Sequence, residues 1–478
     1  MKLSRVMIAN RGEIASRIIR ACHAAGLETV LAVSEADRDS LPARQAGRAV
    51  CIGPAAPGRS YLNRKAIVAA ALGTGADALH PGYGFLSESP ELASLCAGHG
   101  ITFVGPRAEH IQQMGNKLEA RAFAKRHGIP VLPGSEKVAT YEDAVKVVDR
   151  IGLPVMMKAA AGGGGRGMKV VEAVKEVEAA FVAASAEARS AFGDETLYLE
   201  RFISNARHIE VQVLGDRHGN VIHLGERDCS LQRRHQKVVE EAPAPGLSDA
   251  LREKIRQAAV ALARSMRYES AGTVEFIYDG DAKTFYFLEM NTRIQVEHPV
   301  TEMITGVDLV REQLHIATGE PLGIKQSDVA FRGHAIECRI TAELPYENFR
   351  PSPGRISVWK PPQGKHVRVD THCFENYVVP MHYDSLLAKL IVHGDDRSQA
   401  IQRMLDSLDG FSIEGVGTIL PFLKRAVGHP AFVAGRMNTC LVGEILNDLI
   451  SRPKAVRTAA KGARRRAKKA ARRRTRSA

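Results

Sequence analysis

The chain has 478 residues, of which 45% are hydrophobic and 25% are charged, and its formal net charge is +13. This length and composition suit a globular protein of two to four domains, and they exclude collagen-like, low-complexity and small disulfide-bonded proteins. The excess positive charge lies in residues 453–478, which contain twelve Lys and Arg and no acidic residue. The remaining 54 basic and 53 acidic residues nearly balance, so the body of the protein is close to neutral.

The seven cysteines are scattered along the chain, and none of them is spaced as Cys-x-x-Cys. This distribution favours free thiols in a reducing cytoplasm over disulfides or structural zinc. The N-terminus lacks the hydrophobic stretch of a signal peptide, and the longest uncharged run, 92–106, is too short to span a bilayer. We therefore expect a cytoplasmic protein without membrane segments.

Strands and helices alternate in the first hundred residues. Buried strands are predicted at residues 6–9, 29–33, 76–79 and 101–104. Between the first two strands, apolar residues recur at helical spacing from Ile14 to Cys22, and Gly26 follows as a helix C-cap. This βαβ rhythm predicts an α/β fold with a parallel sheet. Ligands usually bind beyond the carboxyl ends of such strands, where segments 10–13 and 80–84 lie.

Two further units follow. The second begins with a helix and ends with a hairpin; its expected elements are a helix at 116–126, strands at 155–158, 210–215 and 221–225, a helix at 248–266 and the hairpin at 272–292. The third unit is rich in strands from 333 to 392 and closes with helices near 397–407 and 418–427.

The hairpin brings two acidic residues together. A three-residue loop at 281–283 would set Glu275 opposite Glu289, with Cβ atoms about 5 Å apart. Like charges at this spacing destabilise a sheet unless a cation bridges them, and carboxylate oxygens on fixed strands suit Mg²⁺ or Mn²⁺. The alternative is a pair of solvated carboxylates at a sheet edge.

The second hairpin strand has a polar face. If it stays extended beyond the hairpin, one face carries Glu289, Asn291, Arg293, Gln295 and Glu297. The opposite face would pack through Met290, Ile294 and Val296. A cation, a carboxylate and amides in one row can hold a small anion and accept a proton from it, which favours a functional strip over a solvated surface.

A glycine run at 162–167 follows the predicted strand that ends at Lys158. The run is neither a Walker loop nor a Rossmann fingerprint. It can close its N–H groups over phosphate oxygens as a mobile lid beside Lys158, or it can be a flexible hairpin with a surface lysine.

The block 226–237 is charged nearly throughout, and its default interpretation is a solvated face, although a strand and two prolines flank it. No arrangement beyond the nearby His235 supports Cys229 as a nucleophile.

Several long segments closely resemble the biotin carboxylase subunit or domain of biotin-dependent carboxylases, within the ATP-grasp superfamily. These segments are 8–14, 80–88, 162–168, 226–245, 289–298 and 333–339. The resemblance covers residues 1–446 and implies an α/β fold in three domains. It implies an N-terminal βαβ (pre-ATP-grasp) domain at 1–114, an ATP-grasp domain at 115–330 with a lid at about 131–203, and a C-terminal α+β domain at 331–446. The basic tail at 447–478 has no counterpart in the family and is expected to be disordered.

The resemblance also implies roles for individual residues. ATP would be bound by Lys117, Lys158, the lid glycines Gly163, Gly164 and Gly165, and by Glu200, His208, Gln232 and His235. The metal ligands would be Glu275, Glu289 and Asn291. Bicarbonate would be bound by Lys237, Arg293, Gln295 and Val296, with Glu297 as its general base. Arg339 would stabilise the biotin enolate, and Tyr83 would lie near the biotin ring. The lid departs from the family in having four glycines after Ala161, where members often have five.

The implied activity is ATP- and bicarbonate-dependent carboxylation of biotin by a homodimer that uses two Mg²⁺ or Mn²⁺ ions. This is the first half-reaction of an acyl-CoA carboxylase, in fatty acid synthesis or propionyl-CoA metabolism. No Met-Lys-Met biotin-attachment motif occurs, so we expect the biotin carboxyl carrier protein and the carboxyltransferase to be separate chains.

Two alternatives remain at this point. One is an ATP-grasp ligase that joins a carboxylate to an amine, although such an enzyme has no use for Arg339 or the 293–297 strip. The other is nucleic-acid binding through the tail at 453–478, which would be nonspecific and salt-sensitive. A disordered solubilising or partner-docking tail is the favoured interpretation.

Overall fold

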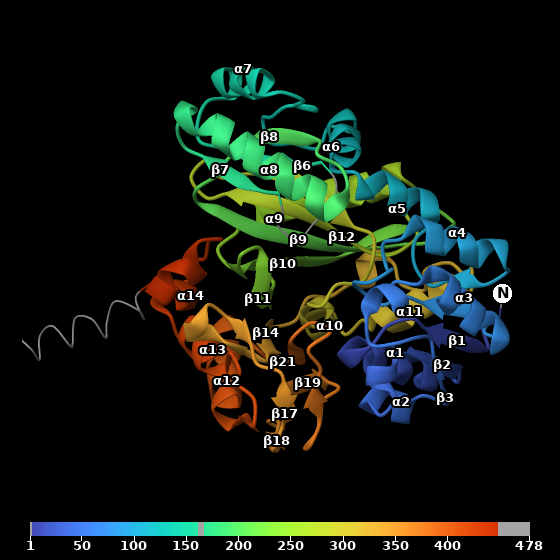
Figure 1. Ribbon diagram of the computed structural model, residues 1–478. Coiled ribbons are helices and arrows are strands. Elements are labelled where there is room, and N and C mark those ends of the chain that lie inside the picture. Colours follow the sequence, from blue (N-terminus) through green and yellow to red (C-terminus); the bar gives the residue numbers. More distant parts are fainter. Residues whose placement is uncertain (1, 161–166, 448–478) are drawn as a thin grey trace, which may run out of the picture.

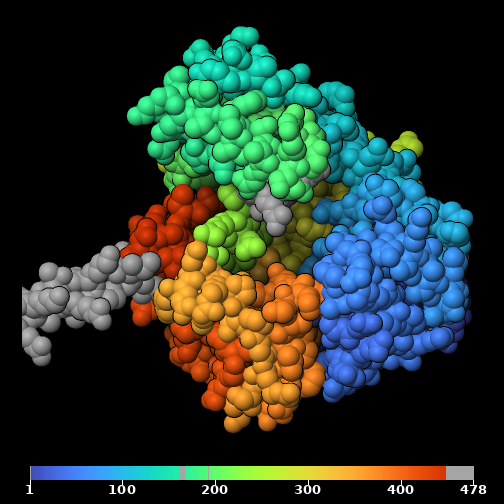
Figure 2. Space-filling model, in the orientation of Figure 1, coloured from blue at the N-terminus to red at the C-terminus, as the bar shows by residue number. Residues whose placement is uncertain are grey.

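The computed structural model describes residues 2–160 and 167–447, which form three parts (Figure 1) around a central hollow (Figure 2). The predicted basic tail and the lid glycines Gly163, Gly164 and Gly165 lie outside the described residues. Among the described helices, none is both long and apolar enough to cross a membrane. All seven cysteines are free, as predicted.

The N-terminal part is an α/β domain whose five-stranded parallel sheet has the order β3-β2-β1-β4-β5, which confirms the predicted fold class. Its elements are β1 (Arg5–Ile8), α1 (Gly12–Ala24), β2 (Glu28–Val33), α2 (Leu41–Gln45), β3 (Arg48–Cys51), α3 (Arg64–Gly73), β4 (Ala78–His80), α4 (Pro90–Gly98), β5 (Thr102–Phe103) and α5 (Ala108–Gly115). Gly26 follows α1 with φ +70°, as the predicted cap requires. Asn10 Nδ2 donates to the carbonyls of Pro81 and Tyr83, both at 2.7 Å, and so joins the segments that follow β1 and β4.

The middle part begins with a helix and the small subdomain predicted to be the lid, at the top of Figure 1. These elements are α6 (Lys117–Arg126), α7 (Tyr141–Ile151), β6 (Val155–Ala159), β7 (Lys169–Val171), α8 (Val177–Phe192) and β8 (Leu197–Arg201). Helices α7 and α8 pack on the three-stranded sheet β7-β6-β8 and bury Val148, Met157 and Ala184. The lid therefore has a core of its own.

One eight-stranded sheet, of order β13-β12-β9-β10-β11-β14-β21-β19, joins the middle part to the C-terminal part. The middle part contributes β9 (Ala206–Gly215), β10 (Val221–Arg233), β11 (Gln236–Ala242), α9 (Asp249–Ser265), β12 (Ser270–Asp279), β13 (Thr284–Asn291), α10 (His298–Thr305) and α11 (Leu309–Ala317). The C-terminal part contributes β14 (His334–Thr341), β15 (Glu343–Leu344), β16 (Arg350–Pro351), β17 (Gly354–Arg355), β18 (Val358–Lys360), β19 (Val367–Thr371), β20 (Val378–Val379), β21 (Leu386–Gly394), α12 (Arg397–Gly410), β22 (Ser412–Glu414), α13 (Leu420–Val427) and α14 (Pro430–Val433). The junction is the antiparallel pair β11–β14, so the sheet continues across the predicted domain boundary before residue 331.

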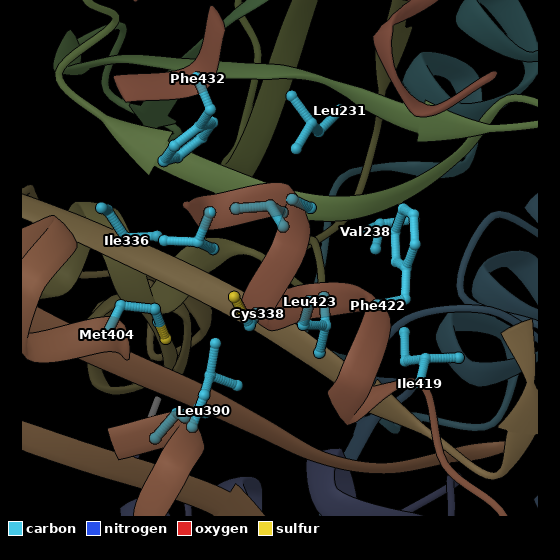
Figure 3. Close-up of a cluster of buried hydrophobic side chains, with 14 of the residues drawn as sticks. Leu231, Val238, Ile336, Cys338, Leu390, Met404, Ile419, Phe422, Leu423 and Phe432 are labelled. Atoms are coloured by element: carbon cyan, nitrogen blue, oxygen red, sulfur yellow. The ribbon is translucent and has the colours of Figure 1, made fainter. Parts of the chain in front are cut away.

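A single hydrophobic core lies under this junction (Figure 3). Leu231 and Val238 of the middle part pack with Cys338 and Leu390 of the C-terminal strands and with Phe422 of α13. All five side chains are nearly or fully buried. The middle and C-terminal parts are thus held together by apolar packing as well as by strand pairing.

The charged block predicted as a solvated face is instead largely the buried second half of β10. Residues 226–232 are all buried, and the exposed residues of the block are Arg234, His235 and Gln236. Ion pairs with residues distant in sequence make this possible: Glu226 lies 2.6 Å from Arg256 of α9, and Asp228 lies 2.6 Å from Arg207 of β9. Buried charges persist when they are paired in this way.

Candidate active site

A cavity of about 1060 Å³ lies where the N-terminal domain, the lid and the eight-stranded sheet meet, at the hollow seen in Figure 2. Most of the predicted site residues line it: Tyr83, Lys117, Lys158, His208, Gln232, His235, Lys237, Glu275, Glu289, Asn291, Arg293, Gln295, Val296, Glu297 and Arg339. Glu200 lies behind the wall and contacts Lys158. The fold therefore brings together residues that are more than 250 positions apart in sequence.

The hairpin β12–β13 sets Glu275 directly opposite Glu289, as predicted, but by a different route. The loop at 280–283 has four residues rather than three, so pairing starts one residue out of the predicted register. A β-bulge at Leu288 then shifts the register and restores the predicted pair. Without this bulge Leu288 would face Glu275, so the irregularity places the second acid in the site.

Glu275 and Glu289 can supply the carboxylates of a divalent-metal site. Glu275 is buried, its Oε1 accepts a hydrogen bond from Asn291 Nδ2 at 2.9 Å, and His208 Nε2 lies 2.9 Å from its Oε2. The Glu289 side chain is 33% exposed and lies 3.5 Å from Lys117 Nζ. One acid is therefore held rigidly and the other remains accessible. Oxygen ligands on fixed strands are the donor set that Mg²⁺ or Mn²⁺ prefers, so these residues fit the ion.

Lys237 is the electrostatic centre of the site. Its Nζ lies 2.6 Å from Glu210, 3.0 Å from Glu275 and 2.5 Å from Glu297. Burial by itself lowers the pKa of Lys237, but the three carboxylates outweigh it and raise the pKa well above its ordinary value. For Glu275 both effects have the opposite sign: burial raises its pKa, but Lys237 and His208 outweigh burial and hold the pKa well below its ordinary value. Both side chains are charged at neutral pH.

A second bulge, in β11, places two polar side chains on one face. Leu231 of β10 pairs with Val239, and the next residue, Gln232, pairs with Lys237. Val238 is therefore the extra residue in β11. Strict alternation would put Lys237 and Glu240 on opposite faces of the strand. Instead both act on the same acid: Lys237 contacts Glu297 directly, and Glu240 lies 2.5 Å from Arg339, which lies 2.8 Å from Glu297.

Glu297 lies between two cations at the start of α10. Its Oε1 contacts Lys237 and its Oε2 contacts Arg339, and the side chain is only 2% exposed. Burial raises the pKa of Glu297, but Lys237, Arg339 and the nearby Arg227 outweigh it and hold the pKa well below its ordinary value. The carboxylate is therefore ionised at neutral pH and can accept a proton from an acid bound beside it.

The predicted polar strip converges on the cavity, although not as an extended strand. Strand β13 ends at Asn291, and the segment that follows is irregular. Arg293 Nη2 donates to Asn291 Oδ1 at 2.7 Å, and its Nε donates to Glu88 Oε2 at 3.0 Å. Gln295 Nε2 donates to Glu275 Oε1 at 2.7 Å. The expectation of an extended strand is wrong, and Val296, expected on the packed face, lines the cavity instead, but the polar side chains are grouped as predicted.

The lid side of the cavity carries the predicted nucleotide cations. Lys158, on β6, has 9% of its side chain exposed, and its Nζ lies 2.5 Å from Glu200 Oε2. Arg121 lies 2.7 Å from the other oxygen of Glu200. Lys117 is the first residue of α6, whose N-cap Asn116 accepts hydrogen bonds from two backbone N–H groups. These contacts orient two lysines toward a shared space without fixing Lys117 to a buried partner.

Two predicted nucleotide residues form a fixed pair, and a third is exposed. Gln232 Nε2 lies 2.6 Å from His208 Nδ1 and donates to the Cys229 carbonyl at 2.8 Å. Burial lowers the pKa of His208, but the Glu275 carboxylate acts in the opposite direction, and the net shift of the pKa is upward. His235 is exposed in the turn after β10, with φ +65°. Cys229 is buried and burial raises its thiol pKa well above the ordinary value, which agrees with its exclusion as a nucleophile.

Tyr83 lines the N-terminal wall of the cavity. Its hydroxyl donates to Glu13 Oε1, and Asn10 holds its backbone carbonyl. Burial and the neighbouring Glu13 raise the pKa of Tyr83 well above its ordinary value, so the phenol stays protonated. An oriented, neutral aromatic ring at this place suits an apolar ring system.

Sequence reasoning missed Arg227, which is fully buried and uses all five of its N–H donors. Its Nε donates to Glu210 at 2.5 Å. Its Nη atoms donate to Gln212 and Thr301, each at 2.9 Å, to Gln295 at 3.0 Å and to Thr273 at 3.2 Å. One signal was available: in β9 the polar residues His208, Glu210 and Gln212 alternate with Ile209, Val211 and Val213, which is typical of a strand with a polar inner face.

Comparison with known sequences agrees with this geometry. Three family profiles match the chain: "Biotin carboxylase, N-terminal domain" over residues 2–111, "Carbamoyl-phosphate synthase L chain, ATP binding domain" over 116–325, and "Biotin carboxylase C-terminal domain" over 337–444. The chain is 52% identical over 446 residues to the biotin carboxylase of Nostoc sp., an alignment that covers 93% of this chain and 100% of that protein. It is 51% identical over 438 residues to biotin carboxylase 1 of Bacillus subtilis, covering 91% and 97% of the two chains.

Solved structures agree as well. A biotin carboxylase complex with β,γ-ATP from Campylobacter jejuni superimposes with a TM-score of 0.91 at 46% identity, covering 93% of this chain and 99% of that one. The biotin carboxylase domain dimer of the 2-oxoglutarate carboxylase of Hydrogenobacter thermophilus, in complex with MgADP, ADP and bicarbonate, gives a TM-score of 0.90 at 45% identity, with coverage of 93% and 98%. The chain therefore belongs to the biotin carboxylase family of ATP-dependent carboxylating ligases, within the ATP-grasp superfamily.

Proposed function

We propose that this protein uses ATP and bicarbonate to carboxylate biotin, which a separate carrier protein presents to the cavity. The observation that carries the proposal is the position of Glu297, an ionised acid between Lys237 and Arg339 in the wall of a large cavity. A carboxylate-to-amine ligase would need the nucleotide lysines but no acid held between two cations. The bicarbonate found in the Hydrogenobacter thermophilus relative supports the same choice.

In the first step bicarbonate binds to Lys237, Arg293, Gln295 and the Val296 backbone, and Glu297 takes its proton. The negative charge of the bound anion raises the pKa of Glu297 toward the range that a base needs, because like charges at short distance disfavour ionisation. Lys237 offsets the charge on both groups, since its ammonium already contacts Glu297 at 2.5 Å. The deprotonated bicarbonate then attacks the γ-phosphate of ATP and forms carboxyphosphate and ADP.

Phosphoryl transfer needs positive charge around the transferred group. Lys117 and Lys158 supply two cations on the lid side of the cavity. Glu275, Glu289 and Asn291 would hold two Mg²⁺ or Mn²⁺ ions, which would neutralise phosphate oxygens during transfer. The lid glycines, Glu200, His208, Gln232 and His235 would surround the nucleotide and exclude water.

In the second step carboxyphosphate decomposes to CO₂ and phosphate, and the phosphate removes the ureido proton of biotin. Arg339 then stabilises the negative charge that develops on the ureido oxygen, because a guanidinium presents several N–H donors to an oxyanion. Its own position is fixed by Glu240 and Glu297. Tyr83 packs against the biotin ring, and CO₂ adds to the ureido nitrogen.

The proposal extends to assembly and location. The protein acts as a homodimer in the cytoplasm, where its seven free thiols remain reduced, and a separate carboxyltransferase completes the reaction of an acyl-CoA carboxylase. That reaction belongs to fatty acid synthesis or propionyl-CoA metabolism. We also propose that the three domains end at residues 114, 330 and 446.

The test is bicarbonate-dependent release of ADP, stimulated by free biotin. Glu297→Gln keeps the shape of the side chain and removes the base, so we expect turnover to fall by at least about 100-fold while ATP binding is retained. Normal turnover in this variant would show that Glu297 is not the base. ADP release that depends on an amine, and not on biotin, would overturn the proposed function itself.

A further inference from the structure

Lys389 of β21 is a fully buried lysine beside the site, and the proposed chemistry gives it no role. Its Nζ donates to the Val296 carbonyl at 2.9 Å, lies 3.1 Å from Glu13 Oε1, and lies 3.8 Å from Asp370 Oδ2. Burying an ammonium group is costly unless it is paired and hydrogen-bonded. The two carboxylates meet this condition, and they leave one N–H directed at a backbone carbonyl of the active-site wall.

That carbonyl belongs to a tight turn that carries the base. His298 Nδ1 lies 2.8 Å from the Gln295 carbonyl, and Glu297 is the N-cap residue of α10. Val296 lines the cavity, and its N–H donates to no other residue in the ranges that the structure describes. Since Lys389 holds the Val296 carbonyl, it fixes the peptide unit that joins the Val296 amide to the Glu297 carboxylate.

Lys389 also connects this turn to the opposite wall. Glu13, in the first turn of α1, accepts the Tyr83 hydroxyl and is the closest acid to the Lys389 ammonium. Three segments far apart in sequence therefore meet at one buried cation: α1, the turn before α10, and β21. A neutral side chain at 389 could fill the space, but it could not hold the carbonyl and the acid together.

We propose that Lys389 is a positioning residue for bicarbonate: it sets the distance and angle between the Val296 N–H and the Glu297 carboxylate. The inference rests on the proposed function, in which these two groups bind and deprotonate bicarbonate. Loss of this contact frees the Val296 carbonyl, so the peptide unit between Val296 and Glu297 can turn. The Val296 N–H then shifts relative to the Glu297 carboxylate, which Lys237 and Arg339 still hold. The nucleotide contacts lie on other elements. The defect should therefore appear in the use of bicarbonate and not in the binding of ATP.

The main variant is Lys389→Met, which keeps the length of the side chain and removes its donors. With saturating ATP and free biotin, we expect the KM for bicarbonate to rise by at least about tenfold, the size of effect that follows from losing a hydrogen bond of a charged group. The dissociation constant for ATP, measured without turnover, should stay within about twofold.

Because Lys389→Met leaves Glu13 buried without its cation, the double variant Glu13→Gln/Lys389→Met is also needed. It removes the ion pair as a unit, so its thermal unfolding midpoint should recover toward that of the wild type, while the KM for bicarbonate stays raised. Asp370→Asn is the matched control, since it changes another neighbour of Lys389 and leaves the Val296 contact in place. Its KM for bicarbonate should be unchanged.

The outcomes separate the inference from the proposed function. If the wild type releases no ADP in response to bicarbonate, the proposed function fails. If the wild type responds and both Lys389 variants keep its KM for bicarbonate, Lys389 has no positioning role. Recovery of the bicarbonate KM together with stability in the double variant would also overturn the inference, because it would show that the effect came from an unpaired charge.

Discussion

Glu240 on β11 and Glu337 on β14 lie directly opposite each other in the eight-stranded sheet, and both are fully buried. Arg339 holds Glu240, whereas neither carboxylate oxygen of Glu337 has a hydrogen-bond partner among the described residues. Burial raises the pKa of Glu337 and outweighs the opposing effect of Lys389, and Glu240 raises that pKa further, so it lies well above its ordinary value. Burial therefore favours the neutral form of Glu337, which allows two acids to face each other behind the active site.

The first prediction concerns the pH dependence of stability. Folded Glu337 keeps a proton that the unfolded chain loses above its ordinary pKa near 4.5, so the wild-type free energy of unfolding should fall as pH rises. Glu337→Gln removes this slope. Its stability relative to the wild type should therefore increase as the pH rises above about 5, by up to about 1.4 kcal/mol per pH unit.

Urea denaturation of wild type and variant at several pH values measures this difference. Glu347→Gln, at an exposed ion pair with Arg350, is the control and should show no comparable trend. A constant difference between Glu337→Gln and the wild type across this range would mean that Glu337 is not protonated in the folded state.

A second prediction tests the five hydrogen bonds of Arg227. Arg227→Lys keeps the charge, but an ammonium has three donors and cannot span the same acceptors, so several buried partners lose their hydrogen bonds. We expect the free energy of unfolding to fall by about 2–5 kcal/mol. Arg189→Lys, at the exposed ion pair with Glu195, should change it by less than about 0.5 kcal/mol. Equal effects in the two variants would contradict the assigned role.

A third prediction separates the two steps of the reaction at Arg339. Arg339→Gln combined with Glu240→Gln avoids an unpaired buried carboxylate, and it should lower the rate of biotin carboxylation by at least about 100-fold. Bicarbonate-dependent ADP release should fall much less, so ADP and carboxybiotin should no longer form in equal amounts. If both rates fall by the same factor, Arg339 acts in the first step instead.

A fourth prediction concerns the lid. Lys158→Met removes the proposed phosphate-binding cation but leaves Glu200 paired with Arg121 at 2.7 Å, so the lid should stay folded. We expect the KM for ATP to rise by about 10- to 100-fold, with the KM for bicarbonate little changed. Lys169→Met, in the same small sheet, is the control and should behave as the wild type. An unchanged KM for ATP in Lys158→Met would remove this residue from the nucleotide site.

Local signals made much of the fold predictable. Gly26 after α1 occupies the capping position that the sequence indicates, and α6 and α9 begin where helices were predicted, after the N-cap residues Asn116 and Ser248. The parallel sheet of the N-terminal domain follows from the same alternation of short apolar strands and amphipathic helices. These features depend on residues close together in the chain, and so a single sequence contains them.

The active site was predictable only in part, because its details depend on distant partners. The pairing of Glu275 with Glu289 was predicted correctly although the predicted loop length was wrong. The longer loop shifts the register by one residue, and the bulge at Leu288 shifts it back. The buried half of β10 was missed because its charges are neutralised by side chains far along the sequence, such as Arg256 for Glu226. Polarity alone gives no sign of such partners.

The pairing of β11 with β14 limits how this protein can be divided. The profile of the ATP-binding domain ends at residue 325 and that of the C-terminal domain begins at residue 337, which suggests a place to cut the chain. A fragment that stops there would expose the backbone N–H and C=O groups of β11 along an open edge and uncover Leu231 and Val238. Such a fragment would tend to aggregate, so expression of this enzyme in pieces should keep residues 206–446 on one polypeptide.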